Sequence, residues 1–176
     1  MCHCNVLKFT MTTFISVEQN MDHLSFLKMA VDEAFKGMRS GDGGPFGAVI
    51  IKDGRIIGKG HNTVLSSKDP TAHAEINAIR HACGQLDDHR LTGAVIYTNF
   101  EPCPMCLSAI YWADIRSLYY CNGRADAEKL GFMDAHLYHE ISLKEDHREV
   151  KISRISVPEM EALMEEWMEL DGRNLY

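Results

Sequence analysis

The sequence predicts an α/β fold, a three-layer α/β/α sandwich around a mixed, partly parallel sheet of five strands. Two observations support this class. Two β-branched runs joined at Asp53-Gly54 are typical of a hairpin, and after it short apolar runs alternate with helical segments. The length of 176 residues, 45% of them hydrophobic, is enough for one globular domain with a sizeable core.

The first element is a helix, which the apolar periodicity predicts from Met21 onward. Apolar residues recur at intervals of three and four as far as Met38, and Asp22 is a suitable N-cap. The segment SGDGGPFG at 40–47 ends this helix because glycine and proline both disfavour it. The hairpin follows directly and extends to Asn62.

Beyond the hairpin, helical and strand-like segments follow each other towards the C-terminus. The apolar run GAVIYTN is typical of a strand that is buried on both faces, and Pro104 suits the first turn of the helix after it. We expect helices at 73–86, 104–114, 125–131 and from Pro158 onward, and strands at 93–99, 117–121 and 150–156.

These elements define one domain at 21–157 with a segment at either end. Residues 1–20 differ in pattern from the rest and are predicted to be a disordered extension, whereas 158–176 are predicted to form an acidic helix and tail. No apolar run approaches the ~18–20 residues that span a bilayer. The N-terminus also lacks the pattern of a secretory signal, so we expect a cytoplasmic protein without a membrane anchor.

The charge balance and the cysteines narrow the classes of partner. Eighteen basic and 25 acidic residues give a formal net charge of −7 at pH 7. Proteins that bind a phosphate backbone use clustered lysine and arginine, so this balance argues against a nucleic acid as the main partner. Six cysteines in a chain of this size favour metal binding or buried thiols over a disulfide framework.

Two of the cysteines stand three positions apart in EPCPMC, residues 101–106. A C-x-x-C pair alone is a redox pair, half of a metal site or a coincidence. Cys103 and Cys106 lie at the start of a predicted helix, so they can face one point, and the helix dipole favours their thiolates. His73 begins another predicted helix and supplies a third ligand, which leaves the fourth position of a tetrahedral zinc ion to water.

Glu75, two residues after His73, completes a recognisable pattern. H-x-E followed downstream by P-C-x-x-C is the signature of zinc-dependent nucleobase deaminases. Zinc lowers the pKa of its bound water towards about 7, so we expect Glu75 to take a proton from water, pass it to a ring nitrogen and later protonate the departing amine. Glu101, ahead of the cysteines, is expected to be a structural hydrogen-bonding group.

The residues named so far and their surroundings resemble the small zinc-dependent guanine deaminases of the cytidine deaminase-like fold. The resemblance runs from Met21 to Tyr176, and Ser108 departs from it by standing where glycine is expected. DPTAHAE is also typical of tRNA adenosine deaminases, whereas PCPMC with IYWA and the long acidic C-terminal region resemble guanine deaminases. The more specific segments are GGPFGAVIIKDG, GHN, DPTAHAEINAIR, EPCPMCLSAIYWA, GFMDAHLY and the terminal tyrosine.

The resemblance implies hydrolysis of guanine to xanthine and ammonia, with one Zn²⁺ per subunit and water or hydroxide as its fourth ligand. It also implies a homodimer whose subunits exchange their C-terminal segments. Asp134 would accept hydrogen bonds from the N–H edge of guanine and assist proton transfer, and Tyr176 would close the pocket. The residues implied to contact the substrate are Asn62, Phe46, Ala74, Trp112, Asp134 and Tyr176.

Several alternatives remain open from the residues alone. Asn62 could instead cap a turn, and Asp134 could cap a short helix. Another deaminase of the same fold could act on cytosine, a nucleoside such as guanosine, a triazine such as ammeline, or tRNA adenosine. The net charge of −7 disfavours tRNA. A non-catalytic structural zinc protein would need four protein ligands and has no use for Glu75.

Overall fold

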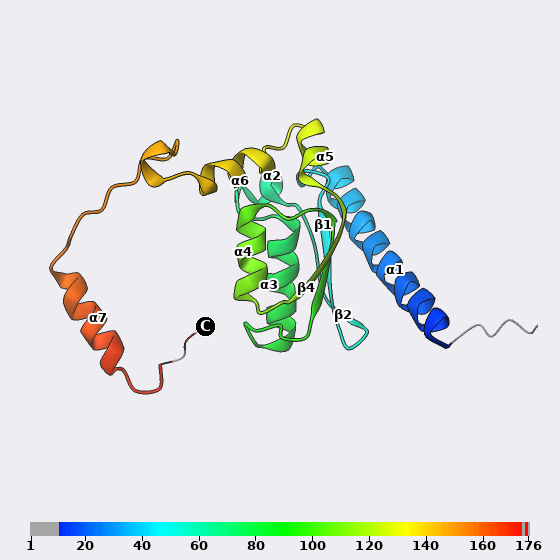
Figure 1. Ribbon diagram of the computed structural model, residues 1–176, viewed down its shortest axis with the longest axis horizontal. Coiled ribbons are helices and arrows are strands. Elements are labelled where there is room, and N and C mark those ends of the chain that lie inside the picture. Colours follow the sequence, from blue (N-terminus) through cyan, green and yellow to red (C-terminus); the bar gives the residue numbers. More distant parts are fainter. Residues whose placement is uncertain (1–10, 174, 176) are drawn as a thin grey trace, which may run out of the picture. The chain divides into compact units, whose positions relative to one another are not determined.

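The computed structural model describes residues 11–173 and Leu175. The chain divides into two compact units, Met1–Ala135 and His136–Tyr176. The first unit contains the whole sheet, and the described part of the second contains helices and extended chain (Figure 1). No helix within the described ranges is long and apolar enough to cross a membrane.

A mixed sheet forms the middle layer of the first unit. Its strands are β1 (Gly47–Lys52), β2 (Arg55–His61), β3 (Val95–Phe100) and β4 (Ser117–Asn122). Their order in space is β2-β1-β3-β4, with β1 antiparallel to β2 and β3, and β4 parallel to β3. Asp53 and Gly54, between β1 and β2, have φ values of 51° and 71°, as a tight two-residue hairpin turn requires.

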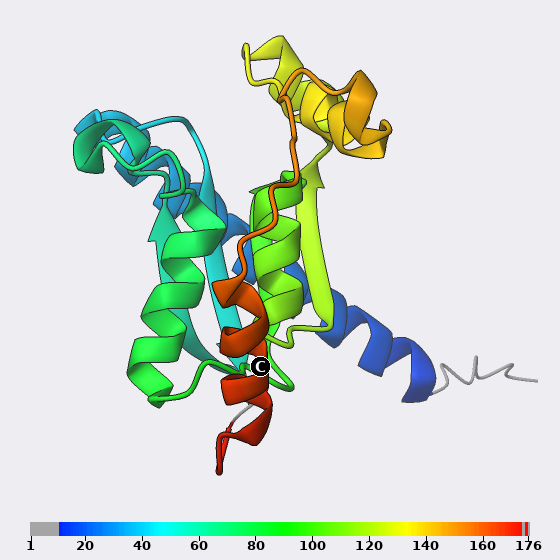
Figure 2. The same cartoon turned by 90° about the vertical axis from the view of Figure 1, so that its left-hand side faces the viewer.

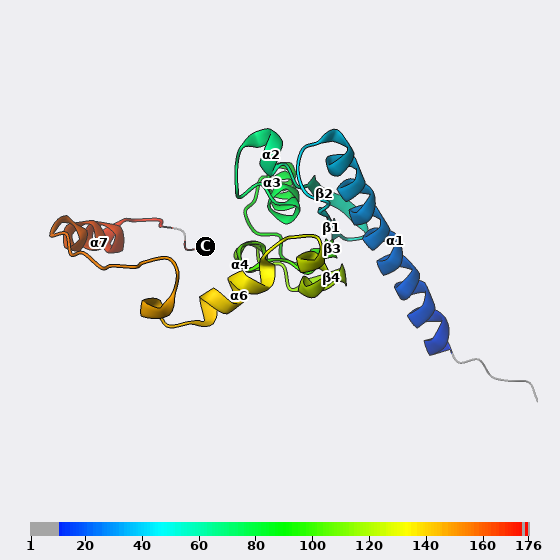
Figure 3. The ribbon, with the colours of Figure 1, turned by 90° about the horizontal axis from the view of Figure 1, so that it is seen from above.

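Helices cover both faces of this sheet. Helix α1 (Met11–Ser40) lies on one face, and α3 (Ala74–Leu86) and α4 (Pro104–Trp112) lie side by side on the other (Figure 2 and Figure 3). Successive residues of a strand point to opposite faces. Accordingly, Val49 packs in the core beneath α1, whereas Ile50 packs in the core beneath α3 and α4.

Shorter elements complete the two units. They are α2 (Val64–Ser67), α5 (Arg124–Lys129), α6 (Asp134–Ser142), the 3₁₀ helix η1 (Glu145–His147) and α7 (Glu159–Glu169). Helix α6 begins just before the boundary between the units. None of the described residues of the second unit is buried, and most of its large apolar side chains, such as Leu163 and Trp167 on α7, are exposed.

The α/β class and the mixed, partly parallel sheet are confirmed, but the described sheet has four strands instead of five. Residues 150–156, predicted as a strand, form no ladder within the described chain, and a strand exists only where a neighbour pairs with its backbone. Helix α1 begins at Met11, ten residues before the helix start predicted at Met21. A helix can extend backwards without a periodic apolar face once it is nucleated. Residues 1–10 lie outside the described residues.

Candidate active site

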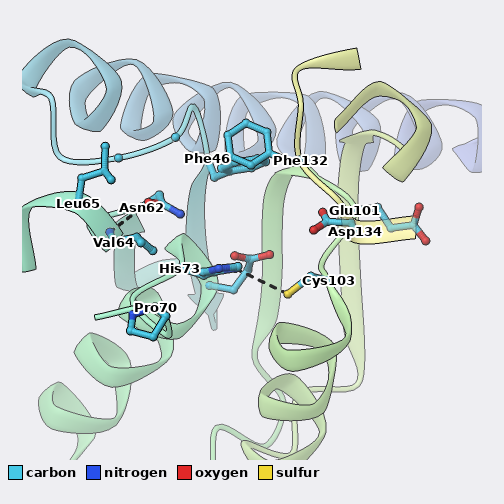
Figure 4. A pocket seen from close by; sticks show the side chains of 13 residues that line it. Phe46, Asn62, Val64, Leu65, Pro70, His73, Glu101, Cys103, Phe132 and Asp134 are labelled. Carbon is cyan, nitrogen blue, oxygen red and sulfur yellow. Dashed lines mark hydrogen bonds between the residues drawn. The ribbon is translucent and has the colours of Figure 1, made fainter. Parts of the chain in front are cut away.

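Two helix N-termini meet at one edge of the sheet. Because β2 and β3 are both antiparallel to β1, they end at the same edge, and α3 and α4 begin there. His73 is the N-cap of α3 and Cys103 is the N-cap of α4, both with extended backbone. Cys106 follows in the first turn of α4, and Pro104 at the helix start fixes that turn. Figure 4 shows His73 and Cys103 pointing towards each other.

The three predicted ligands lie at distances that suit a single zinc ion. His73 Nδ1 is 3.7 Å from Cys103 Sγ and 3.5 Å from Cys106 Sγ, and all three ligand atoms lie within 4.8 Å of one another. Ligand atoms at ordinary Zn–S and Zn–N distances in a tetrahedron are about 3.5–3.8 Å apart. Small movements of these side chains therefore suffice to coordinate zinc.

The ionisation of the two cysteine thiols also favours a bound cation. The pKa of Cys103 is lowered to about 4, chiefly because Cys106 hydrogen-bonds to its thiolate, with His73 contributing as well. The pKa of Cys106 is raised by its hydrogen bond to Cys103 and by burial. Two buried thiolates side by side are thus unfavourable on their own, and a divalent ion would allow both to ionise.

Glu75 lies in the first turn of α3 with 8% of its surface exposed, and it lines the cavity beside the cluster. Burial raises the pKa of its carboxyl to about 7. A group with such a pKa both accepts and releases protons near neutrality, which is what a proton carrier between water and substrate must do. Helix α3 therefore presents a ligand and a proton carrier from one turn.

The cavity has a volume of about 440 Å³, within the usual range of ~300–1,000 Å³ for small-molecule sites. Phe46 and Phe132 form an aromatic wall, meeting edge to face with ring centroids 4.6 Å apart. A Cβ atom on Gly44 would lie 2.8 Å from both rings, so only glycine lets the chain pass there. The remaining lining residues are Gly43, Asn62, Val64, Leu65, Pro70, His73, Glu75, Glu101, Cys103 and Asp134.

Asn62 is buried with its side chain at the cavity wall. Its Oδ1 accepts a hydrogen bond from the backbone N–H of Val64 at 3.1 Å, which leaves the Nδ2 donor for a ligand (Figure 4). The backbone of Gly43 passes so close that a Cβ there would stand 2.0 Å from Asn62 Oδ1. The cavity thus offers a fixed amide donor to a carbonyl or ring nitrogen.

Two carboxyl groups line the cavity in addition to Glu75. Glu101 accepts hydrogen bonds from the backbone N–H and the side-chain Nε of Arg124, at 3.1 and 3.2 Å, and these bonds lower its pKa. Asp134 is the first residue of α6, and its pKa is raised by burial and then by the charge of Cys103. The geometry gives Glu101 a structural partner and leaves Asp134 facing the cavity (Figure 4).

Two of the expected substrate-binding residues, Ala74 and Trp112, do not line the cavity. The Ala74 side chain is fully buried in the core beneath α3, because the turn that points His73 and Glu75 to the site directs it inward. Trp112 is at the far end of α4 with 65% of its surface exposed, eight residues beyond the Pro104 that begins the helix. Tyr176 lies outside the described residues.

Sequence reasoning missed Phe132, Gly43 and Gly44 as parts of the site. The pair of glycines lies in the segment that ends the first predicted helix, and the phenylalanine precedes Asp134 by two residues in GFMDAHLY, one of the segments that carry the resemblance. A glycine pair directly before Pro-Phe is a signal that could have indicated a close approach of backbone to side chains. Nothing in the sequence pattern indicated that Phe132 would meet Phe46.

A histidine, two cysteines and a buried glutamate at the start of two helices, beside a cavity for a small ring, define a zinc-dependent deaminase. The family model for the "Cytidine and deoxycytidylate deaminase zinc-binding region" matches residues 20–122. The chain belongs to this family.

The comparison with individual relatives is more specific. The chain is 44% identical to the guanine deaminase of Bacillus subtilis over 156 residues, which is 89% of this chain and 100% of that protein. The X-ray structure of the Bacillus subtilis guanine deaminase matches with a TM-score of 0.84, covering 88% of this chain and 98% of that one.

Other relatives match over shorter ranges. The tRNA-specific adenosine deaminase of Aquifex aeolicus is 44% identical over 95 residues, or 54% of this chain and 62% of that protein. A solved structure of guanine deaminase from Nitrosomonas europaea is 31% identical, with a TM-score of 0.54, and covers 63% of this chain and 62% of that one. The similarity to the Aquifex tRNA enzyme therefore covers about half of this chain, whereas the similarity to the Bacillus guanine deaminase covers 89% of it.

Proposed function

We propose that this chain is a guanine deaminase, which hydrolyses guanine to xanthine and ammonia in purine catabolism or salvage. The observation that carries the reaction type is Glu75, a buried carboxyl group next to the His73, Cys103 and Cys106 cluster at the cavity. The similarity to the Bacillus subtilis guanine deaminase over that protein's full length supports guanine as the substrate.

The reaction divides between the metal and the chain. We assign one zinc ion per subunit to His73, Cys103 and Cys106; when bound, it supplies a water molecule of lowered pKa as its fourth ligand and as the nucleophile. Glu75 accepts a proton from that water and delivers it to the ring nitrogen next to the carbon under attack. Once the water oxygen has bonded to the carbon that carries the amino group, Glu75 takes the second proton from this new hydroxyl group and delivers it to the amino group. The C–N bond then breaks, ammonia leaves, and the hydroxyl oxygen becomes the carbonyl of xanthine.

The cavity walls orient the base. We assign Asn62 Nδ2 as the donor to the carbonyl or ring edge of guanine, because its Oδ1 is already engaged by Val64. Asp134 accepts hydrogen bonds from the N–H groups of guanine, which a neutral acceptor would satisfy less well, and assists proton transfer. Phe46 stacks against the ring from the aromatic wall.

Other substrates of the same chemistry are weaker candidates. A tRNA substrate calls for a positive surface, and the chain carries a net charge of −7. Cytosine is a single ring and would leave much of a 440 Å³ cavity unfilled. Guanosine and ammeline remain to be excluded by assay. A structural zinc protein would leave the buried Glu75 without a role.

We also propose that the active form is a homodimer in which the C-terminal segments are exchanged, and that the last residue, Tyr176, closes the partner's cavity. The exposed apolar side chains of α7 support a role in association, since monomers rarely expose so many. We propose that the extended chain at 150–156 pairs with the edge strand β4 and adds a fifth strand to the sheet.

We also propose a cytoplasmic location. The free cysteines among the described residues suit a reducing compartment such as the cytoplasm.

Two variants separate catalysis from metal binding. Glu75→Gln should retain zinc, measured by elemental analysis of the purified protein, and lose about 10²–10⁴-fold in kcat for guanine. Cys103→Ser should lose both zinc and turnover. Full activity of the glutamine variant would overturn the mechanism, and a wild-type protein that binds zinc without deaminating guanine would overturn the proposed substrate.

A further inference from the structure

We propose that His61 is a positioning residue that, through Asp42, holds the amide of Asn62 in the orientation that binds the purine. The inference rests on the proposed function, because it assigns Asn62 to the substrate. His61 is the last residue of β2 and does not line the cavity. Its effect on the substrate must therefore pass through the residues between its ring and the cavity.

The imidazole of His61 is held between two carboxylates from different elements. Its Nε2 lies 3.1 Å from Asp42 Oδ2, and its Nδ1 lies 3.6 Å from Glu33 Oε2 on α1. Only 17% of the His61 side-chain surface is exposed. The first contact is a hydrogen bond, and the second is too long to be one. His61 thus joins the end of β2 directly to Asp42 in the loop between α1 and β1.

Asp42, which accepts the hydrogen bond from His61, is also bonded through its backbone to α1 and to α2. Its backbone carbonyl accepts hydrogen bonds from Leu65 N–H at 3.0 Å and Ser66 N–H at 3.1 Å, at the start of α2. Its own N–H donates to Gly37 O at 3.0 Å, at the end of α1. One residue further along, Gly43 lies against the Asn62 amide. A displacement of Asp42 would therefore move the wall against which that amide is packed.

The backbone around Asn62 is secured separately, so the His61 side chain acts on the loop and not on β2 itself. Asn77 Nδ2 donates to His61 O at 2.9 Å and lies 3.0 Å from Thr63 Oγ1. Asn62 N–H donates to Phe46 O at 3.0 Å. Removing the imidazole leaves these contacts in place and takes away the side-chain hydrogen bond by which His61 reinforces the backbone hydrogen bonds of Asp42, next to Gly43 and Asn62. The expected defect is a loosened amide donor in a folded protein.

Gly37 provides an independent way to disturb the same contact. A Cβ atom at this position would lie 2.4 Å from Cδ2 of the His61 ring and 2.9 Å from His61 Cβ, so Gly37→Ala would force the His61 side chain out of its present position beside Asp42. Alanine is the better helix former, and Gly37→Ala removes no hydrogen-bonding group. Gly84, in α3, has no atom within 4 Å of its ideal Cβ position and is the matched control for the same substitution.

The test is steady-state kinetics with guanine on the zinc-loaded, full-length protein. His61→Ala should raise KM about tenfold and change kcat by less than about twofold, the size expected when one hydrogen bond to a positioned group is lost. His61→Gln, which keeps a donor near the place of Nε2, should restore most of the affinity. Gly37→Ala should reproduce the rise in KM, whereas Gly84→Ala should not.

Two further comparisons separate positioning from general stability. His81, an exposed histidine whose Nδ1 lies 3.2 Å from the backbone nitrogen of Lys59, is the control, and His81→Ala should leave KM unchanged. In an Asn62→Ala background, His61→Ala should add nothing to KM, because residues that act through one another are not additive. An additive rise, or a fall in kcat as large as the rise in KM, would overturn the proposal.

The outcome remains interpretable if guanine is not the substrate. Wild-type protein that fails to turn over guanine refutes the proposed function, and amide hydrogen exchange then decides the inference about His61. His61→Ala should speed exchange at the backbone amides of Leu65 and Ser66, which donate to Asp42 O, and should leave exchange at the Asn62 amide unchanged. His81→Ala should change none of the three. Equal protection in the wild type and His61→Ala would show that the imidazole does not hold this loop.

Discussion

At the scale of single residues, the site depends on groups whose properties burial has changed. A glutamate in water is ionised at neutral pH, whereas burial brings the pKa of Glu75 to about 7. The pKa of Cys103 is lowered and the pKa of Cys106 is raised, because one thiolate is favourable at this place and two are not. Zinc binding and proton transfer therefore follow from placing these side chains at the first turns of two helices that pack on one sheet.

The contact between Gly43 and Asn62 predicts a specific effect of adding one methyl group. Gly43→Ala places a Cβ atom 2.0 Å from Asn62 Oδ1, so the amide must rotate or the loop must shift. We expect KM for guanine to rise about tenfold or more, because a hydrogen bond to the substrate is lost. Steady-state kinetics with guanine measures this. An unchanged KM would exclude Asn62 as a substrate contact, and Gly84→Ala serves as the control.

At the scale of elements, glycine allows α3 to lie close to β2. A Cβ atom on Gly60 would stand 2.4 Å from the carbonyl oxygen of Ala74 and 2.6 Å from the N of Ala78. The position of His73, one residue before α3, therefore depends on the tight approach of helix and strand. The packing of α3 on the sheet therefore determines where the metal ligand His73 lies.

Gly60→Ala should disturb both stability and zinc binding, since it forces α3 away from β2. Overpacking of this kind costs about 1–3 kcal/mol in the free energy of unfolding. Gly84 lies on α3 itself and has no atom within 4 Å of its ideal Cβ position, so Gly84→Ala should instead stabilise the protein by about 0.5–1 kcal/mol. Urea denaturation and zinc titration measure the two effects. Equal stability of both variants would contradict the close packing described here.

The sequence predicted elements well where the pattern is local. The hairpin, α3, α4 and the strands beneath them follow from apolar periodicity and from residues such as Asp53, Gly54 and Pro104. The strand expected at 150–156 could not be settled in this way, because alternation shows that a segment can form a strand and not which neighbour it pairs with. The start of α1 at Met11 was also missed. Met11, Phe14 and Ile15 stand at helical spacing, but a polar run at 18–20 separates them from the apolar pattern that begins at Met21.

The same distinction applies to the site. Spacing alone placed His73, Glu75, Cys103 and Cys106 at two helix starts, and the structure brings them together. Trp112 was assigned to the pocket through a resemblance, but its position at the end of α4 keeps it from the cavity within this chain. The Phe46–Phe132 wall depends on a contact between segments more than 80 residues apart, which no local pattern encodes.

At the scale of the whole molecule, the C-terminal unit has the properties of a segment that associates. Most of its described large apolar residues, among them Ile155, Leu163 and Trp167, are exposed. Exposed apolar surface of this extent is unfavourable in water, so we expect it to be covered in the active protein. Deletion of residues 172–176 should raise KM or abolish turnover of guanine if the tail closes the cavity.

Exchange between subunits makes a prediction that closure within one chain does not. The chain truncated at 171 and the full-length Glu75→Gln variant should each be inactive by themselves. When the two are unfolded together and refolded with zinc, mixed dimers should regain activity, because the glutamine variant can lend its tail to the intact catalytic residues of the truncated chain. A mixture that stays inactive, or a truncated protein with wild-type kinetics, would contradict the exchange.

The central claim is that this zinc-dependent deaminase acts on guanine. The most direct test is ammonia release by purified, zinc-loaded protein from guanine, guanosine, cytosine, adenine and ammeline, measured side by side at equal concentration. We predict rapid release from guanine and little from the other four. Rapid release from one of the others instead would keep the zinc chemistry and contradict the assigned substrate, and no release from any of them would contradict the function proposed for this chain.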